Sequence, residues 1–269
     1  MTKWPKYALL ASTALLMVWP FLWMIGTSFK GLAEATTPSL SPWPREWHPE
    51  NYIQAFQAAP FARYFLNSLA VSITIAGLVS LTAIMAGYAL ARLRFPGKRI
   101  LFGAILATMM IPFEATLIPN FVLIGKLGWY NTYWALVVPW CANAFSIFLM
   151  RQAFLGLPED YFDAARVDGC GHLRFLARIA APLAKPAVVT VALFAFLGGY
   201  NGLLWPLVVT TDESMRVVQV GLTVFAGDAG VRVNLLMCAS AIVILPAAAV
   251  YFAAQRQVQE GALGAGIKA

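Results

Sequence analysis

Six apolar runs separated by polar linkers dominate the chain. They cover roughly residues 7–28, 66–91, 100–124, 132–150, 184–209 and 233–254. A helix needs about 20 apolar residues to cross the hydrocarbon core of a bilayer, and each run is close to that length. The pattern therefore predicts an all-α membrane protein with six transmembrane helices, built as a single domain over residues 1–269.

Composition agrees with a bilayer as the solvent. The chain is 60% hydrophobic and 12% charged, with a mean hydropathy of +0.71, whereas a soluble domain carries about 25% charged residues. The net charge of +7 could indicate nucleic acid, but the basic residues are scattered at the ends of the apolar runs. That distribution is typical of membrane topology. We therefore expect contact with membrane lipid and none with nucleic acid.

The basic residues also predict an orientation. With the N-terminus in the cytoplasm, 13 of the 19 lysines and arginines fall in cytoplasmic segments and 6 in outer ones. The cytoplasmic set is Lys3, Lys6, Arg92, Arg94, Lys98, Arg99, Arg151, Arg166, Arg174, Arg178, Lys185, Arg256 and Lys268, and the outer set is Lys30, Arg45, Arg63, Lys126, Arg216 and Arg232. Because cytoplasmic loops are enriched in basic residues, we expect both termini in the cytoplasm.

Two runs contain residues that interrupt a helix. The stretch "IPFEATLIP" (111–119) is flanked by prolines and holds Glu114, the only carboxylate inside a run, and "FLGGYNGLLWP" (196–206) holds three glycines and Asn201. A broken helix is tolerated in a membrane where a cavity or a neighbouring helix satisfies its backbone. Each stretch could therefore line a solute path. Equally, Glu114 could be a helix-end residue and the glycines could serve close helix packing.

The outer linker 29–64 is rich in proline and tryptophan. Its sequence "PSLSPWPREWHPENYIQAF" predicts an ordered interfacial loop followed by a short amphipathic helix, with His48 as a loop residue. The first run lacks a small-residue cleavage site, so we expect a retained anchor rather than a signal peptide. The three cysteines show no metal-binding spacing, and we expect neither a zinc site nor a disulfide framework.

The linker 151–183 is unusually polar for this chain. Pro158 and the two acids after it predict a helix start, and Gly169 predicts its C-terminal stop. Residues after Gly171 predict a second short helix that ends at Pro182. We expect a cytoplasmic helix–turn–helix between the fourth and fifth spans. Its small and charged residues suit a docking surface, although the loop could also simply pack on its own membrane domain.

This linker resembles the EAA loop of ABC importer permeases. That family pattern runs Glu-Ala-Ala, three residues, Gly, nine residues, Ile and then Pro, and the matching positions here are Asp163, Ala164, Ala165, Gly169, Ile179 and Pro182. Two positions depart from it: Asp163 replaces the usual Glu, and Cys170 stands where Ala is common. Aspartate keeps the charge but is one methylene shorter, so a contact of the family glutamate does not transfer directly.

The resemblance extends over nearly the whole chain. The stretches "FPGKR" (95–99), "FLMRQAFLGLP" (148–158), "WPLVVT" (205–210) and "QRQVQEGALGAGIKA" (255–269) look like the second, maltose-type permease of carbohydrate importers. The family's "WN" in the fifth span is Tyr200-Asn201 here. The resemblance implies a permease of the bacterial inner membrane that couples ATP hydrolysis on other subunits to solute entry.

The resemblance also implies partners and site residues. The expected partners are a second permease, two ATPase subunits and an extracytoplasmic solute-binding protein. The ATPase-coupling residues would be Asp163, Ala164, Ala165, Arg166, Asp168 and Gly169. The chain has no GxxxxGK[ST] phosphate loop, so ATP and Mg²⁺ would bind the ATPase subunits, and we expect this chain to be neither an enzyme nor a cofactor protein.

The solute is less well defined by sequence. Candidate path residues are Glu114, Asn120, Asn143, Tyr200, Asn201 and Trp205. Aromatic and amide side chains suit a sugar or polyol, and no basic residue inside a span favours a phosphate ester, but a glycerol-phosphate importer stays an alternative. An ion-coupled secondary transporter would carry more intramembrane charges and internal repeats, and a membrane enzyme would need paired catalytic groups.

Overall fold

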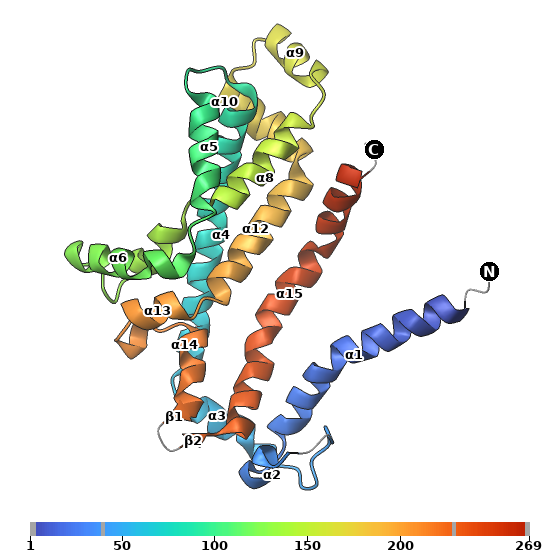
Figure 1. Ribbon diagram of the computed structural model, residues 1–269, viewed down its shortest axis with the longest axis vertical. Helices are drawn as coiled ribbons and strands as arrows, with labels where there is room; N and C mark the ends of the chain where they lie inside the picture. Colours follow the sequence, from blue (N-terminus) through green and yellow to red (C-terminus); the bar gives the residue numbers. More distant parts are fainter. Residues whose placement is uncertain (1–3, 39–40, 228–229, 267–269) are drawn as a thin grey trace. The chain divides into compact units, whose positions relative to one another are not determined.

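The computed structural model describes residues 4–38, 41–227 and 230–266, and these are mostly helical (Figure 1). Lys3 and Lys268 of the orientation argument lie outside the described residues. Contacts divide the chain into two units, Met1–Phe65 with Val217–Pro246 and Leu66–Arg216 with Ala247–Ala269. Each unit is described by itself below.

Three helices are continuous and long enough to cross a membrane: α1 (Trp4–Ser28), α4 (Phe61–Arg92) and α15 (Val233–Gly266). Three further candidate spans are pairs of helices joined at a bend. They are α5 (Lys98–Thr108) with α6 (Phe113–Lys126) at 97°, Tyr133–Trp140 with α8 (Ala144–Leu155) at 44°, and His172–Leu183 with α12 (Lys185–Tyr200) at 85°. A helical membrane protein with three to six spans is therefore confirmed.

Three of the apolar runs hold an interrupted helix, and only the interruption in 132–150 was not expected from the sequence. In 100–124 the chain breaks before Pro112, whose extended backbone (ψ 143°) starts α6 in a new direction. In 132–150, α7 (Tyr133–Val137) passes into a 3-10 turn, Val138–Trp140, before α8 begins. In 184–209, α12 ends at Tyr200 and α13 (Leu204–Val209) follows a short non-helical segment. The interruptions expected in the third and fifth runs are thus confirmed.

The first unit ties the end of α1 to the outer linker. That linker forms α2 (Leu32–Thr36), a loop and α3 (Glu50–Gln57), which confirms the predicted short helix. Asn51 donates from its amide to the carbonyls of Ser28 and Lys30, both at 2.9 Å. The imidazole of His48 lies 2.7 Å from the carboxylate of Glu50, and this hydrogen bond lowers the pKa of Glu50. Polar contacts together with packing of the Phe29 ring on Trp47 and Tyr52 hold this linker.

Small elements complete the first unit. They are α14 (Val218–Leu222), a 3-10 turn (Thr223–Phe225) and the two-residue strands β1 (Ala226–Gly227) and β2 (Gly230–Val231), which pair antiparallel with Ala226 opposite Val231. The rings of Phe61 and Phe225 stack with centroids 5.7 Å apart. Gly221 lies so close to Tyr64 that an added Cβ would be 2.5 Å from its ring. The start of α4 is therefore packed tightly.

The second unit gathers α5, α8 and α12 around α4 and carries the polar linker at one end (Figure 1). The linker folds as α9 (Asp160–Val167), α10 (His172–Phe175), a π-helical turn (Leu176–Ala180) and α11 (Ala181–Leu183). The helix–turn–helix is confirmed, and Gly169 ends α9 with φ +66°. Two boundaries differ from expectation: α8 runs on to Leu155, and the second helix passes Pro182. We call residues 156–183 the coupling loop; its second half, His172–Leu183, is also the first part of the bent pair with α12.

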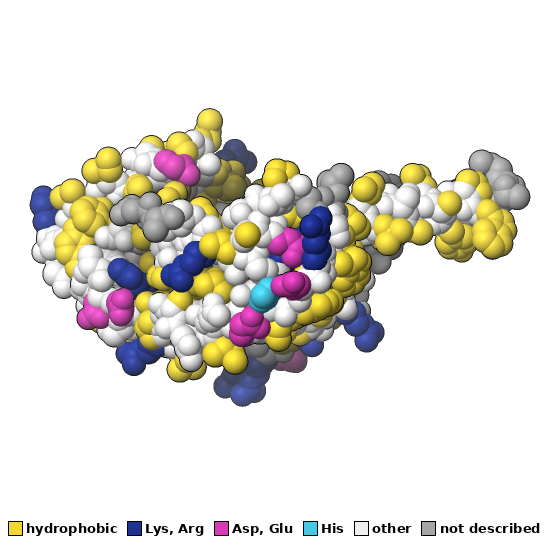
Figure 2. Space-filling model, turned by 90° about the horizontal axis from the view of Figure 1, so that it is seen from below, with side chains coloured by type: hydrophobic (Ala, Val, Ile, Leu, Met, Phe, Trp, Pro, Cys, Tyr) yellow, Lys and Arg dark blue, Asp and Glu magenta, His cyan; other side chains and the backbone are white. Residues whose placement is uncertain are grey.

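Charged side chains do not gather into one patch on the face shown in Figure 2. Basic and acidic side chains are interspersed there with apolar ones.

Candidate solute cavity and coupling loop

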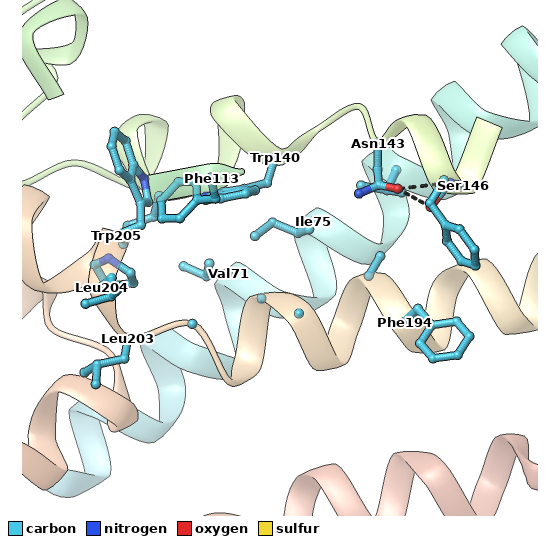
Figure 3. Close-up of a pocket in the computed structure, with 18 residues that line it drawn as sticks. Val71, Ile75, Phe113, Trp140, Asn143, Ser146, Phe194, Leu203, Leu204 and Trp205 are labelled. Atoms are coloured by element: carbon cyan, nitrogen blue, oxygen red, sulfur yellow. Dashed lines mark hydrogen bonds between the residues drawn. The ribbon is translucent and has the colours of Figure 1, made fainter. Parts of the chain in front are cut away.

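The second unit contains a cavity of about 450 Å³ where the broken helices meet α4 (Figure 3). Small-molecule sites usually occupy roughly 300–1,000 Å³, so a small solute fits. The lining residues come from α4, α6, α7, α8, α12, α13 and the breaks between them: Val71, Ile75, Val79, Phe113, Leu136, Trp140, Asn143, Phe145, Ser146, Phe194, Ala195, Gly198, Gly199, Gly202, Leu203, Leu204, Trp205 and Pro206. None of these described residues is charged.

Three aromatic side chains form one end of the cavity (Figure 3). The Phe113 ring lies 5.1 Å from Trp140 and 6.4 Å from Trp205, and the two tryptophans meet edge to face at 6.5 Å. Trp205 is buried, and its indole nitrogen donates to the carbonyl of Ala135 at 2.8 Å. Trp205 therefore offers a solute only its ring, because its donor is already used.

The polar part of the cavity is the start of α8. Asn143 caps that helix: its Oδ1 accepts from the backbone nitrogen of Ser146 at 3.0 Å and lies 3.2 Å from the Ser146 hydroxyl. Figure 3 shows the amide nitrogen on the side away from Ser146. The cap thus fixes the rotamer of Asn143 and leaves an amide N–H group available to a hydroxyl-bearing solute.

The glycines of the fifth run have two different roles. A Cβ on Gly199 would lie 3.1 Å from Ile75 and 3.3 Å from Ser72, so Gly199 permits close packing of α12 on α4. A Cβ on Gly198 would meet no atom within 4 Å and would enter the cavity instead. The two interpretations of this stretch, close packing and a cavity wall, therefore apply to neighbouring residues.

The structure brings together two of the six expected path residues. Asn143 and Trp205 line the cavity. Tyr200 is buried and stacks on Phe196 at 5.7 Å, and Asn201 is exposed at the end of α12. Glu114 lies exposed in the first turn of α6, where a carboxylate suits the positive end of the helix dipole. Asn120 lies farther along α6 and is half-buried, and neither of these two lines the cavity.

Sequence reasoning missed Phe113, Trp140 and Ser146 as cavity residues. Phe113 and Trp140 directly adjoin breaks, at Pro112 and at the 3-10 turn, and Ser146 completes the cap at Asn143. An aromatic residue next to a break inside an apolar run was the available signal.

The coupling loop presents a mixed apolar and charged surface. Val167 and Leu173 are 87% and 74% exposed. Asp163 and Arg166 pair on the surface of α9 at 3.2 Å, with side chains 62% and 76% exposed. Ala165 is buried, whereas Ala164, Asp168 and Gly169 are exposed. Exposed apolar side chains beside charges on a short helix are typical of a protein docking surface.

These features together define a class of protein: a multi-span helical membrane protein whose helices break around an uncharged cavity and which presents a polar helical loop. The family model described as "Binding-protein-dependent transport system inner membrane component" matches residues 79–261, more than half of the chain. The chain therefore belongs to the family of inner-membrane permeases of binding-protein-dependent ABC transporters.

Curated relatives agree with this assignment, and a solved structure shares the fold. The diacetylchitobiose uptake system permease protein NgcG of Streptomyces coelicolor is 32% identical over 94% of this chain and 85% of its own length. The sn-glycerol-3-phosphate transport system permease protein UgpE of Yersinia enterocolitica is 31% identical over 83% and 82%. The crystal structure of a bacterial ABC transporter involved in import of the acidic polysaccharide alginate matches with a TM-score of 0.81 at 24% identity, covering 93% of this chain and 94% of its own.

The family membership fixes the general activity. This chain is a multi-pass permease of the inner membrane, and it acts in an ABC transporter together with an ATPase and a solute-binding protein. It is the transport subunit and not itself the ATPase.

Proposed function

We propose that this permease passes a neutral sugar, or a related polyol, through the cavity between α4, α8 and α12. The complete importer would pair it with a second permease, two ATPase subunits that bind ATP and Mg²⁺, and an extracytoplasmic binding protein. Both termini and the coupling loop would lie in the cytoplasm, where the ATPases are.

The composition of the cavity is the observation that carries the choice of solute. Sugars are bound by aromatic platforms together with amide and hydroxyl groups. The cavity supplies Phe113 and Trp140 as ring surfaces and Asn143 and Ser146 as polar groups. An uncharged wall avoids the cost of desolvating an unpaired charge, so the solute that suits it is itself uncharged.

A phosphate ester is the second candidate, because a relative is a glycerol-phosphate permease. A phosphate group is best held by arginine, lysine or a set of backbone N–H groups. No described cavity residue is basic, so such a solute would depend on charges from the second permease. This chain alone favours the sugar.

The coupling loop supports ATP-driven rather than ion-driven transport. Its exposed apolar residues Val167 and Leu173 flank the sharp turn at Gly169. A secondary transporter works without an ATPase partner, so it would have no use for such a docking surface. Docking of the loop in a surface groove of an ATPase would let nucleotide-driven movement reach the spans.

Reconstituted uptake tests this proposal. The chain, its partner permease, the ATPase and the binding protein are placed in liposomes, and ATP-dependent uptake of labelled oligosaccharides, monosaccharides, polyols and glycerol phosphate is compared. We expect uptake of a neutral saccharide or polyol that requires ATP. Exclusive uptake of glycerol phosphate would contradict the solute class, and uptake by this chain alone without an ATPase would contradict the coupling.

Two variants connect the uptake to the cavity. Asn143→Ser keeps a side-chain acceptor for the N-cap of α8 but removes the amide, so we expect weaker solute uptake with normal assembly. Asn201→Ala changes an exposed amide outside the cavity and serves as the matched control. Equal uptake by both variants and the wild type would remove Asn143 from the site.

A further inference from the structure

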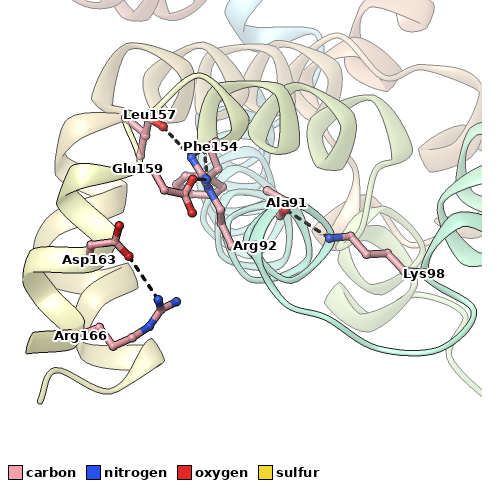
Figure 4. Close-up of polar contacts among 8 residues, drawn as sticks. All are labelled: Ala91, Arg92, Lys98, Phe154, Leu157, Glu159, Asp163 and Arg166. Atoms are coloured by element: carbon pink, nitrogen blue, oxygen red, sulfur yellow. Dashed lines mark hydrogen bonds and ion pairs between the residues drawn. The ribbon is translucent and has the colours of Figure 1, made fainter.

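One arginine at the end of α4 binds the beginning of the coupling loop (Figure 4). Arg92, the final residue of α4, donates from Nε and Nη2 to the carbonyl of Phe154 at 3.1 and 2.8 Å. Its Nη2 also donates to the carbonyl of Leu157 at 2.6 Å, and its Nη1 to Glu159 at 2.6 Å. The side chain is only 13% exposed. One guanidinium thus binds carbonyls in the last turn of α8 and just after it, together with the first acid of the loop.

The same arginine also contacts α9. Its guanidinium carbon lies 3.9 Å from the centroid of the Phe162 ring, within the range of a cation–π interaction. Phe162 in turn packs on Phe175 of α10 with centroids 4.6 Å apart. The two helices of the loop are therefore joined to each other beside the arginine.

A second residue on the same face of α4 holds α10. Tyr88 precedes Arg92 by four residues, about one helical turn, and its hydroxyl is hydrogen-bonded to Nδ1 of His172 at 2.9 Å. Its ring contacts Phe154 edge to face at 5.9 Å and Phe175 at 6.2 Å. Tyr88 is 4% exposed. Arg92 thus holds α9 and Tyr88 holds α10, both from α4.

The opposite part of this helix forms a wall of the solute cavity. Val71, Ile75 and Val79 of α4 line it, and α4 is one continuous helix from Phe61 to Arg92. At 1.5 Å per residue, the distance along the axis from Val79 to Arg92 is about 20 Å. A single uninterrupted helix therefore connects the loop with the cavity wall.

We propose that Tyr88 and Arg92 are positioning residues that fix the coupling loop to α4, so that movement of the loop is transmitted along α4 to the solute cavity. This inference rests on the proposed function, in which the loop receives movement from an ATPase. Arginine suits the position because its planar fork serves two carbonyls and one carboxylate while stacking on a ring. Lysine keeps the charge but cannot make all these contacts at once.

Arg151 provides a matched control within the same unit. It donates from Nε to the carbonyl of Leu90 at 3.3 Å and lies 4.2 Å from the Phe102 ring centroid. Like Arg92, it therefore makes a hydrogen bond to a main-chain carbonyl and a cation–π contact. It joins α8 to α4 and α5, and it makes no polar or ring contact with the described residues of α9 or α10. Arg151→Lys should loosen the helices without loosening the loop.

The experiment compares Arg92→Lys, Tyr88→Phe and Arg151→Lys in the reconstituted importer. For each variant, solute uptake and ATP hydrolysis are measured together, along with co-purification of the ATPase and the midpoint of thermal unfolding. We expect the solute transported per ATP hydrolysed to fall about tenfold in Arg92→Lys and about threefold in Tyr88→Phe, which is the range for residues within a coupling network. We expect Arg151→Lys to keep the wild-type ratio despite a similar thermal shift.

The outcomes separate the inference from a simple loss of structure. An unchanged ratio in both Arg92→Lys and Tyr88→Phe would overturn it, and so would an equal fall in Arg151→Lys. If Arg92→Lys does not assemble, Tyr88→Phe decides, because phenylalanine keeps the ring packing and removes only the hydroxyl. A wild-type complex without ATP-dependent uptake would instead contradict the proposed function.

Discussion

Helices end both at the cavity and at the end of the second unit that carries the coupling loop, which we call the coupling end. The backbone groups at these helix ends find their hydrogen-bond partners in different ways. At the cavity, α7 and α8 are capped by short side chains of their own segments, Thr132 and Asn143, and the donors that reach another segment, Trp205 and Thr82, are neutral. At the coupling end, long cationic side chains reach the carbonyls of another segment. Lys98 donates to Ala91 and Leu93, Arg151 to Leu90, and Arg92 to Phe154.

The hydrogen bonds at the coupling end are therefore expected to be stronger than those at the cavity. A local N-cap contributes about 1 kcal/mol and holds only its own helix. Hydrogen bonds from a charged donor contribute roughly 1.5–3 kcal/mol each and here join separate helices to each other. Of these three cations Arg92 is the one that reaches the coupling loop, so we expect the loop to move together with α4.

The largest effect is expected at the turn of the coupling loop. Gly169 has φ +66°, a conformation that costs other residues roughly 1–2 kcal/mol and β-branched residues more. Gly169→Val should leave the protein inserted but abolish solute-stimulated ATP hydrolysis, measured in the assembled complex. Gly169→Asn is the control, because asparagine tolerates this region. Normal hydrolysis in the valine variant would contradict a docking role for the turn.

A smaller effect is expected from filling the cavity. Gly198→Leu adds a side chain into open space next to the aromatic end, so uptake should fall severalfold while ATPase co-purification is unchanged. The control is Gly77→Leu on α4, where an added Cβ also meets nothing within 4 Å but does not enter the cavity. If both leucine variants transport equally well, this cavity is not on the solute path.

The smallest effect is expected for the surface ion pair of α9. Asp163 and Arg166 are both largely exposed, and such pairs contribute little because water screens them. Asp163→Asn should change the free energy of unfolding by less than about 0.5 kcal/mol while weakening ATPase stimulation if Asp163 contacts the ATPase. Asp163→Glu keeps the charge and serves as the control. A large loss of thermal stability in Asp163→Asn would show that the pair holds the loop together, as Arg92 does.

The sequence was most informative where the structural signal is local. Pro158 and Gly169 mark the ends of α9 because each residue acts through its own backbone, and the predicted helix–turn–helix is confirmed. Hydropathy located the apolar runs, but it measures length and not direction. It therefore gave no sign that α6 would lie at 97° to α5.

The cavity and the Arg92 contacts could not be derived in the same way. Phe113 and Trp140 are distant in sequence and meet only because two separate breaks bring them together. In the sequence, Arg92 is one basic residue at the end of an apolar run, where it indicates the orientation of the chain in the membrane. Its main acceptors are backbone carbonyls of Phe154 and Leu157, which every residue type provides, so no sequence pattern reveals the pairing.

A main-chain acceptor leaves part of the loop sequence free to vary. Arg92 binds the carbonyl of Leu157, so the side chain at that position can change without loss of the acceptor, whereas Phe154 also packs on Tyr88 and must be kept. What must be kept is the number of residues between α8 and Phe162, which sets where the carbonyls and the ring meet the guanidinium. A loop of equal length from a related permease that keeps Glu159, Phe162 and His172 could therefore be grafted onto this scaffold, and partner specificity could diverge while the attachment to α4 stays the same.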